Sequence, residues 1–379
     1  MKTPLQGLRV LDLSTLLPGP YATMLLADLG ADVLRVESAS RPDLVRNMAP
    51  QIDGQSAAFS YLNRGKKSLA LNLKHPEAAG LIAELIKDYD ILVEQFRPGV
   101  MDRLGLDYES LKQINPALIY CSITGYGQNG PYRDRAGHDL NYLALTGAAS
   151  HMGRKDSGPA PMGLQVADVA AGSHPAVISI LAAVIGRQQS GEGCYLDISM
   201  ADNTLAMQAL MAPGALNGGA DPTAESNFLN GGGFYDYYRT ADNRYMAVGS
   251  LEPQFRQRLA QALGIQDNPP LESRQFKTLL QQKFRRQDLD AWCEQLKDLD
   301  ACVEPVLNVS EAAQHPQFQA RGMIVEKSNG ETQIASALGF ERAEPQAAPL
   351  CGEQGDKVLQ NLGYTAREIE GLRESGLFD

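Results

Sequence analysis

The segment from Leu8 to Glu37 reads LRVLDLSTLLPGPYATMLLADLGADVLRVE and decides the fold class. It begins with an apolar strand from Leu8 to Leu13, which is followed by a turn at Pro18-Gly19-Pro20. A helix is expected from Tyr21 to Leu29, and a second strand from Val33 to Val36. This order predicts a β-α-β unit, in which the two strands run parallel and a helix covers one face of the sheet.

The same alternation continues as far as Ser199. Further helices and strands are expected, in chain order, at Pro76 to Lys87 (helix), Ile91 to Glu94 (strand), Tyr108 to Gln113 (helix), Leu118 to Ile123 (strand), Ala170 to Gln188 (helix) and Tyr195 to Ser199 (strand). Strands that alternate with helices predict an α/β fold, with a Rossmann-like parallel sheet that is covered by helices on both faces.

A chain of 379 residues is longer than one small core requires, so two domains are expected. Residues 1–211 form the predicted large domain, and the Gly-rich stretch 212–232 reads as a linker. Residues 233–328, which include a strand at Tyr245 to Val248 and a polar helical stretch from Arg274 to Leu299, predict a smaller α+β domain. Residues 329–379 form a C-terminal segment.

Composition excludes several classes of function. The net charge of −11 argues against nucleic-acid binding, which requires a basic surface. The N-terminus lacks the apolar core of a signal peptide, and no apolar run is long enough to span a bilayer, so we expect a cytoplasmic protein without a membrane partner. The five cysteines are scattered and no HxxxH, HExxH or CxxC pattern occurs, so no metal is expected.

The stretch Gly125-Tyr-Gly-Gln-Asn-Gly130 matches GxGxxG and follows an expected strand. Pro131 and a polar run come next, so no helix starts on the last glycine, and no acidic residue follows at the spacing of a dinucleotide site. Nicotinamide and flavin are therefore not expected. The glycines instead predict a loop that turns tightly or approaches a ligand closely.

Three acids and one histidine are candidates for proton chemistry. His138 and Asp139 begin an apolar helical run, and an acid and a base at a helix N-terminus can exchange protons beside a bound anion or enolate. Asp168 heads the long helix, where it is either an N-cap or a desolvated carboxylate that exchanges protons. Glu252, which precedes Pro253, is either a catalytic partner or a helix-capping acid. Spacing alone leaves these alternatives open.

Basic residues gather in the run Asn63-Arg-Gly-Lys-Lys-Ser68, which contains Arg64, Lys66 and Lys67. Arg41 and Arg97 are the other candidates. Such a group is either a solvated surface or a phosphate site, because Arg and Lys neutralise phosphates well. Charge alone does not decide between the two.

Over nearly its whole length the chain resembles the family III CoA-transferase (CaiB/BaiF) proteins. The motifs that carry this resemblance are GLRVLDL (7–13), PGP (18–20), DLGADV (28–33), NRGKKS (63–68), FRPG (96–99), GYGQNGP (125–131) and Asp168 before its helix. The stretches GHDLNY (137–142) and VGSLEPQF (248–255) resemble the alpha-methylacyl-CoA racemase branch of that family. The transferases of the family usually lack a histidine at the His138 position.

The resemblance implies a two-domain subunit whose C-terminal part returns to the large domain. It also implies an interlocked homodimer, with the active site between the large domain of one subunit and the small domain of the other. Arg41, Arg64, Lys66, Lys67 and Arg97 would hold the phosphates of CoA, and Gly125, Tyr126 and Gly127 would lie beside the CoA moiety. In one departure from the racemases, Ser38 stands where they often carry Arg directly after the acid of the second strand.

The implied reaction is 1,1-proton transfer at the α-carbon of a 2-methylacyl-CoA, with CoA itself as the only cofactor group. His138 and Asp168 would exchange protons on opposite faces, Glu252 would orient His138, and the Asp139 backbone N–H would stabilise the enolate oxygen. One alternative is a CoA transferase with Asp168 as a covalent nucleophile, and another is a non-catalytic CoA-binding protein. The apolar group Met207, Leu210 and Met211 is expected in core packing rather than at the acyl chain.

Overall fold

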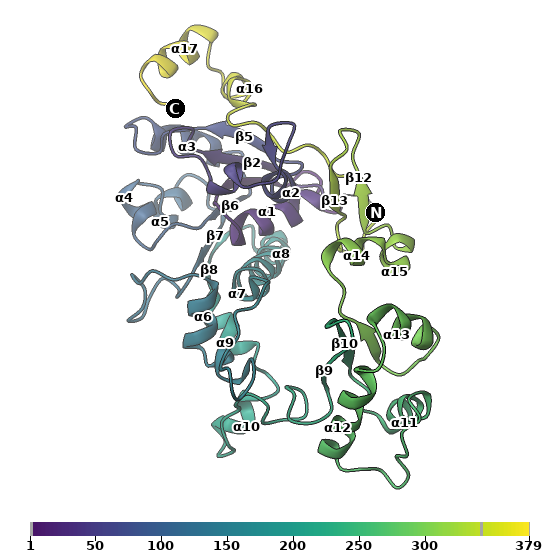
Figure 1. Ribbon diagram of the computed structural model, residues 1–379. Coiled ribbons are helices and arrows are strands. Elements are labelled where there is room, and N and C mark those ends of the chain that lie inside the picture. The colour runs from purple at the N-terminus through teal and green to yellow at the C-terminus, as the bar shows by residue number, and fades with distance from the viewer. Residues whose placement is uncertain (1–2, 342–343, 379) are drawn as a thin grey trace. The chain divides into compact units, whose positions relative to one another are not determined.

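The computed structural model describes residues 3–341 and 344–378, and it divides the chain into two compact units (Figure 1). The first unit comprises Met1–Thr146, Met162–Met207 and Gln317–Asp379, and the second comprises Gly147–Pro161 and Gln208–Pro316. The segment 147–161 thus belongs to the second unit, although the sequence placed it inside the large domain. The chain also re-enters the first unit at residue 317 rather than at 329.

The first unit is built on a six-stranded sheet in the order β5-β2-β1-β6-β7-β8, and every neighbouring pair is parallel. The strands are β1 (Arg9–Leu13), β2 (Asp32–Glu37), β5 (Lys67–Ala70), β6 (Ile91–Glu94), β7 (Ile119–Thr124) and β8 (Cys194–Ser199). The predicted parallel α/β sheet is therefore confirmed. The sequence missed β5, which begins inside the basic run.

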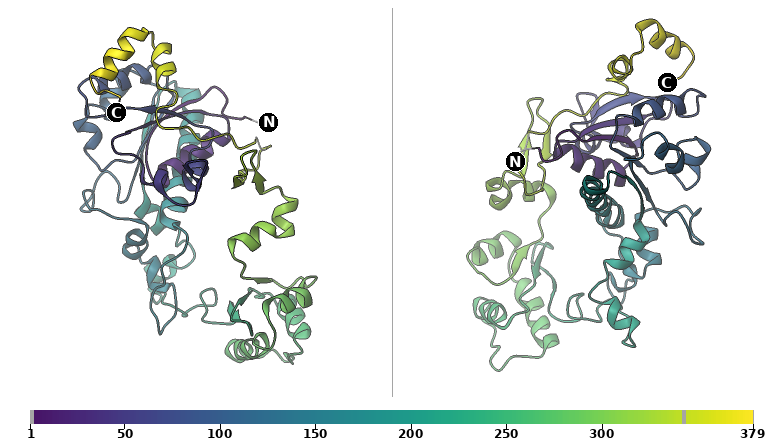
Figure 2. Two further views of the ribbon diagram at one scale, coloured as in Figure 1. Left: turned by 45° about the horizontal axis from the view of Figure 1, so that its top comes forward. Right: turned by 180° about the vertical axis from the view of Figure 1, so that it is seen from behind.

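Helices cover both faces because strand residues point alternately to either side. Leu11 and Leu13 of β1 join the core under α3 (Ala78–Ile86), whereas Asp12 faces α1 (Pro18–Asp28) and accepts a hydrogen bond from Thr23. Two C-terminal helices, α16 (Gly355–Asn361) and α17 (Ala366–Glu374), pack into the α3 core, and Figures 1 and 2 show them beside α3.

A continuous helical segment, Val166–Ser190, consists of α7 (Val166–Asp168), a π-turn (Val169–Ser173) and α8 (His174–Ser190). By length and composition alone it is the one described helix that could cross a membrane, although the sequence led us to expect no apolar run of that length. One side of α8 packs on β7 and β8, whereas the apolar side chains of Ile178 and Ile185 on α8 are exposed.

The second unit contains an antiparallel sheet, β11 (Val303–Pro305), β10 (Tyr245–Val248) and β9 (Asp236–Arg239), in that order. Helices α11 (Pro253–Ala262), α12 (Ser273–Phe284) and α13 (Leu289–Leu296) pack on it around Trp292. The stretch from Arg274 to Leu299, expected to be helical throughout, is therefore two helices joined by a short turn.

The remaining described elements are short. They are η1 (Leu44–Asn47), β3 (Gln51–Ile52), β4 (Gln55–Ser56), α2 (Ala57–Leu62), α4 (Val100–Arg103), α5 (Tyr108–Lys112), α6 (Asp139–Leu145), η2 (Ala148–His151), α9 (Met200–Ala206), α10 (Ala212–Leu216), α14 (Val309–Gln314), α15 (Pro316–Ala320), β12 (Ile324–Glu326) and β13 (Thr332–Ile334). α10 lies in the stretch that was expected to be a linker.

The strand order reverses at β1, and this reversal positions the candidate site. From β1 the chain adds β2 and β5 on one side, and it later adds β6, β7 and β8 on the other. Loops that leave β1 and β6 therefore diverge at the carboxyl edge of the sheet. Such a switch point is where open parallel sheets bind their ligands.

Candidate active site

A cavity of about 320 Å³ lies at the switch point. Its walls come from the loops that follow β1, β6 and β7, together with the start of α6 and the end of α7. His138 and Asp168 both line it, as do Gly125 and Tyr126. The structure thus brings the predicted acid–base pair to one pocket, although 30 residues separate the two in the chain (168 − 138 = 30).

Two glycines allow the wall of this pocket to close tightly. A Cβ on Gly125 would lie 2.5 Å from the Tyr142 hydroxyl oxygen, and one on Gly137 would lie 2.7 Å from the same ring. The Tyr142 hydroxyl donates a hydrogen bond to the Gly137 carbonyl at 2.7 Å. The ring of Tyr126 contacts that of Tyr142 edge-on at 5.2 Å. Tyr142 therefore fixes the loop that presents His138.

Gly127 has a different role from its neighbours in the loop. Its φ of +81° is in the left-handed region that favours glycine, and its N–H donates to Thr124 Oγ1 at 3.0 Å. Gly127 is not among the residues that line the pocket. Of the three loop residues predicted beside CoA, Gly125 and Tyr126 face the cavity, and Gly127 forms the turn.

His138 is at the N-cap position of α6, with an exposed side chain and an extended backbone. Its N–H donates to Asn141 Oδ1 at 3.0 Å, which fixes the first turn of the helix. Asp139 is the first helical residue, a position whose N–H has no partner within the helix. The predicted contact between this N–H and an enolate oxygen stays a prediction.

Asp168 is half-buried at the end of α7. Asp168 lies within the continuous helical segment Val166–Ser190 and makes no side-chain capping hydrogen bond, so the alternative that it is the N-cap of the long helix is wrong. Burial and, second to it, the charge of Asp139 raise the pKa of the Asp168 carboxyl to about 6, and His138 opposes the rise. A carboxyl with this pKa can both hold and release a proton near neutral pH.

Glu252 belongs to the second unit, where it is exposed and occupies the N-cap position of α11. Pro253 follows at the first helical position, as the capping alternative expected. The Glu252 side chain makes no capping hydrogen bond to the helix. Its predicted contact with His138 stays a prediction.

A second cavity, of about 460 Å³, adjoins the first, because Thr15 and Phe96 line both. It lies over the carboxyl ends of β1, β2 and β5. Arg41 and Lys74 are the basic residues at its rim, and the Arg41 side chain is exposed. The sequence analysis missed Lys74. Once β5 is located, a lysine at the carboxyl end of that strand is the signal that could have found it.

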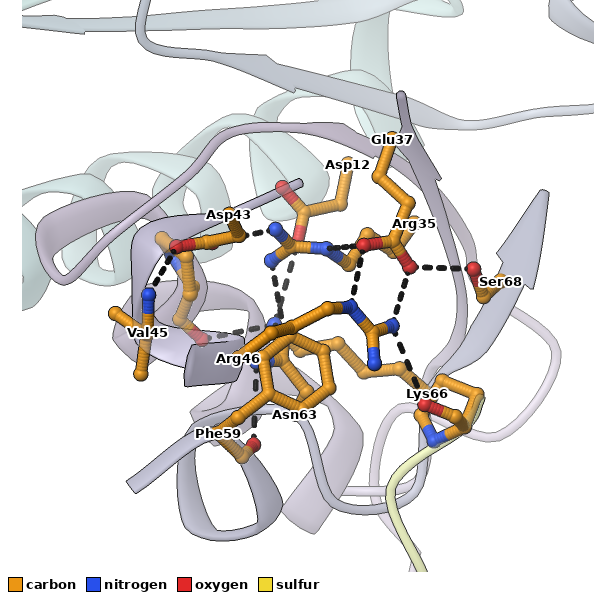
Figure 3. A network of polar contacts seen from close by, with 12 residues as sticks. Asp12, Arg35, Glu37, Asp43, Val45, Arg46, Phe59, Asn63, Lys66 and Ser68 are labelled. Atoms are coloured by element: carbon orange, nitrogen blue, oxygen red, sulfur yellow. Dashed lines mark hydrogen bonds and ion pairs between the residues drawn. The ribbon is translucent and has the colours of Figure 1, made fainter. Parts of the chain in front are cut away.

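Buried ion pairs form the floor of the second cavity (Figure 3). Arg35 pairs with Asp43 at 2.6 Å and donates to Asn63 Oδ1 at 3.0 Å, and Glu37 pairs with Arg46 at 2.6 Å. Burial alone would raise the pKa of the Asp43 carboxyl, but Arg35 and two backbone N–H groups hold that pKa below its ordinary value. Opposite charges therefore neutralise one another in the floor, although Arg35 Nε, 3.6 Å from Glu37 Oε2, makes no hydrogen bond within the described residues.

Three of the residues predicted to bind phosphate are paired with carboxylates of the protein instead: Arg64, Lys66 and Lys67. Arg64 is buried, donates twice to Asp28 at 2.9 and 2.6 Å, and donates to the Ile334 carbonyl at 2.8 Å. Lys66 is buried, and its ammonium group donates to Asp12, Asn63 and Pro20. These contacts contradict the prediction that Arg64 and Lys66 hold phosphates.

Lys67 is at the amino end of β5 and pairs with Asp32 at 2.6 Å, so it lies at the sheet edge opposite both cavities. Arg97, in contrast, is exposed and lines the 320 Å³ pocket. Arg133 and Arg135, which the sequence analysis did not single out, line the same pocket. Of the predicted basic residues, Arg41 lines the 460 Å³ cavity and Arg97 lines the 320 Å³ pocket.

Two further observations concern what surrounds the site. Met207 and Leu210 are exposed, by 46% and 69%, so the expected core packing of this apolar group is wrong. Among residues 3–341 and 344–378, no three His, Cys, Asp or Glu side chains gather as they would around a metal ion.

The fold is that of a doubly wound α/β protein, and its two adjoining cavities lie at the switch point, where such folds bind ligands. The chain belongs to CoA-transferase family III, because the sequence model of that family matches residues 5–355. It is 35% identical to human alpha-methylacyl-CoA racemase, over 99% of this chain and 97% of the racemase. It is 36% identical to the succinate–glutarate CoA-transferase of Agrobacterium fabrum, over 95% of this chain and 96% of the transferase.

A crystal structure of a CAIB/BAIF family protein from Brucella suis has the same fold, with a TM-score of 0.85 and 30% identity over 96% of this chain and 100% of that one. These likenesses support an enzyme that acts on CoA thioesters. Because racemase and transferase relatives are about equally similar, the reaction has to be argued from the site.

Proposed function

We propose that the protein is an alpha-methylacyl-CoA racemase, which interconverts (R)- and (S)-2-methylacyl-CoA thioesters through an enolate. The observation that carries the proposal is that His138 and Asp168 line one pocket from two different helices. Racemisation requires two groups that exchange protons with opposite faces of one carbon. Imidazole and a carboxyl with a pKa of about 6 both do so near neutral pH.

The adjoining cavities support CoA as the carrier of the acyl group. The adenosine phosphates of CoA lie beside Arg41 and Lys74, and the thioester reaches the His138 pocket past Thr15 and Phe96. Cationic side chains at one end stabilise the phosphates by charge-assisted hydrogen bonds. The other end holds the reacting carbon between the acid and the base.

In one direction His138 removes the α-proton, and protonated Asp168 delivers a proton to the opposite face. In the other direction the two residues exchange roles. The Asp139 backbone N–H donates to the enolate oxygen, where negative charge develops. Glu252 accepts a hydrogen bond from the second ring nitrogen of His138 and so fixes its tautomer.

An interlocked homodimer, which would bring Glu252 of one subunit to His138 of the other, is part of this proposal. The apolar surface on α8 and α9 supports it: Ile178, Ile185 and Leu205 are 66%, 61% and 54% exposed. Ile178 and Ile185 are seven residues apart and so lie on one face of α8, and monomers seldom expose several large apolar side chains on one face. Light scattering that gives the mass of one chain at micromolar concentration would contradict the dimer.

The second candidate is a CoA transferase, which the 36% identity to succinate–glutarate CoA-transferase favours. There, a carboxylate oxygen of Asp168 attacks the thioester carbonyl, and CoA thiolate leaves to give a mixed anhydride. The thiolate then attacks the aspartyl carbonyl, which releases the free acid and leaves an aspartyl-CoA thioester. An incoming carboxylate takes up the CoA by the same two steps in reverse.

The test is proton NMR in deuterated water with a single epimer of a 2-methylacyl-CoA. Loss of the α-proton together with appearance of the other epimer is the expected result. Transfer of CoA to an added carboxylate without exchange, with an intermediate at Asp168 that hydroxylamine or borohydride traps, would instead establish the transferase. CoA binding with neither reaction on a panel of thioesters would favour the non-catalytic protein.

Substitutions assign the residues. His138→Ala and Asp168→Asn should each abolish epimerisation, while Glu252→Ala should cost less because Glu252 only orients the imidazole. Leu140→Ala is the matched control, because Leu140 is 55% exposed on the same helix as His138 and does not line the pocket. Near-full activity of His138→Ala would contradict the assignment of His138 and Asp168 as the two groups that exchange protons with the α-carbon.

A further inference from the structure

We propose that the Asp139 carboxylate is a positioning residue for Asp168, and that it holds the two members of the acid–base pair at a fixed separation. The role of this side chain is distinct from that of the Asp139 backbone N–H at the enolate oxygen. The consequence for catalysis rests on the proposed racemase function, whereas the effect on Asp168 itself does not.

The contacts are short and direct. Asp139 Oδ1 accepts the backbone N–H of Ala167 at 2.6 Å and that of Asp168 at 3.0 Å. Asp139 directly follows His138 in the chain, so this one carboxylate joins the segment that carries His138 to the segment that carries Asp168. Asp139 and Asp168, which this hydrogen bond joins, are 29 positions apart in the sequence.

The fold leaves α7 in need of such a contact. α7 begins the continuous helical segment Val166–Ser190, so the backbone N–H groups of its first turn have no partner within the helix. Gln165, at its N-cap position, makes no side-chain capping bond. Asp139 therefore supplies from α6 the acceptor that the N-terminal N–H groups of α7 would otherwise take from a local cap.

The same contact places a negative charge beside the acid. Burial is the largest cause that raises the pKa of the Asp168 carboxyl to about 6, and the Asp139 charge is the next. The other titratable or charged groups around the pocket or on the helices packed against α7 are His138, Tyr142, Tyr126, Arg97, Arg133, Arg135 and Asp202. Of these, His138 lowers the Asp168 pKa.

Two substitutions separate geometry from charge. Asp139→Asn keeps an amide oxygen that can accept both N–H groups, but it removes the charge. The Asp168 pKa should then fall while burial still holds it above that of an exposed aspartate. Asp139→Ala removes both the acceptor and the charge, so Asp168 also loses its position.

The first experiment needs no substrate. The carboxyl of Asp168 is titrated by carbon NMR in protein labelled at aspartate carboxyl groups, with Asp168→Asn to assign the signal. In Asp139→Asn the titration should move to lower pH by about half a unit or more. Asp202→Asn is the matched control, because Asp202 is exposed on α9, which packs against α7. An Asp168 titration that is unchanged in Asp139→Asn would overturn the electrostatic part.

The second experiment uses both epimers of the substrate. For the epimer whose proton Asp168 removes, the acid limb of the kcat/KM profile should move to lower pH in Asp139→Asn. Asp139→Ala should lose about 100-fold in kcat for both epimers, as a misplaced catalytic group does. Wild-type kcat in a folded Asp139→Ala protein would overturn the positioning role. A shifted Asp168 titration in a protein without racemase activity would refute the proposed function and leave the effect of Asp139 on Asp168 standing.

Discussion

Replacing Gly125 with alanine tests whether the close approach of Tyr142 is what holds the pocket wall. Gly125 does not have a positive φ, so alanine is compatible with its backbone, and the objection to a methyl group is steric. The added Cβ would lie 2.5, 2.6 and 2.7 Å from three atoms of the Tyr142 phenol group. Tyr142 is buried, so its ring has to move with its surroundings.

The expected cost follows from two contributions. Forcing one carbon into a packed site typically costs about 1–3 kcal/mol. Displacing the Tyr142 hydroxyl from the Gly137 carbonyl loses a hydrogen bond worth about 1 kcal/mol. Alanine also lowers the conformational entropy of the unfolded chain, which stabilises the folded state by about 0.5 kcal/mol. We therefore expect Gly125→Ala to lower the free energy of unfolding by about 1.5–3.5 kcal/mol.

Urea unfolding measures this difference, and Gly80→Ala is the matched control. Gly80 lies in α3 with no atom near its missing Cβ, so alanine there should stabilise the protein by about 0.5–1 kcal/mol. In a Tyr142→Leu background the cost of Gly125→Ala should shrink, because the clashing ring is gone. Equal costs in both backgrounds, or a Gly125→Ala protein as stable as the wild type, would refute the packing argument.

Three further predictions concern charges. Lys66→Met removes the cation that contacts the buried Asp12 carboxylate, so urea unfolding at pH 7 should show a loss of about 3–5 kcal/mol. Burial raises the pKa of the Glu94 carboxyl from 4.5 to about 7. Between pH 4.5 and pH 7 the folded state therefore binds a proton that the unfolded state has released. The free energy of unfolding of the wild type consequently falls as the pH rises through that range. Glu94→Gln should remove about 3 kcal/mol of that fall between pH 4 and pH 8, and an identical fall in the variant would contradict the assignment. Arg41→Ala should weaken CoA binding in calorimetry by about 1 kcal/mol and reduce its salt dependence, whereas an unchanged affinity would remove Arg41 from the phosphate site.

The sequence could predict the parallel sheet because most of its strands are apolar runs between clear helical segments. β1, β6 and β7 begin and end within one residue of their predicted bounds. The short strand β5 reads KSLA, which is too brief and too mixed for a periodic pattern. Because β5 was not predicted, the sequence analysis also did not place Lys74 in the loop after that strand, at the carboxyl edge of the sheet.

The basic run shows why charge in a sequence is a weak guide to a site. Arg64 forms an ion pair with Asp28, which is 36 positions away in the sequence, and Lys66 forms one with Asp12, which is 54 positions away. These partners meet only after the sheet has formed, so local composition does not reveal that the cations are already neutralised. His138 and Asp168 were easier to single out, because His138 begins an apolar helical run and Asp168 is the one charged residue in an apolar, small-residue segment.

The environment of Asp168 also bears on the choice between the two candidate reactions. At pH 7 a carboxyl with a pKa of 3.8 is protonated in fewer than about one molecule in a thousand, whereas a pKa of about 6 gives about one in ten. That gain of about 100-fold serves a residue that has to deliver a proton. A nucleophile instead has to attack as a carboxylate, the form in which about nine molecules in ten remain at pH 7. The charge of Asp139, held beside Asp168 by two hydrogen bonds, thus supports the proton transfer that we propose for Asp168.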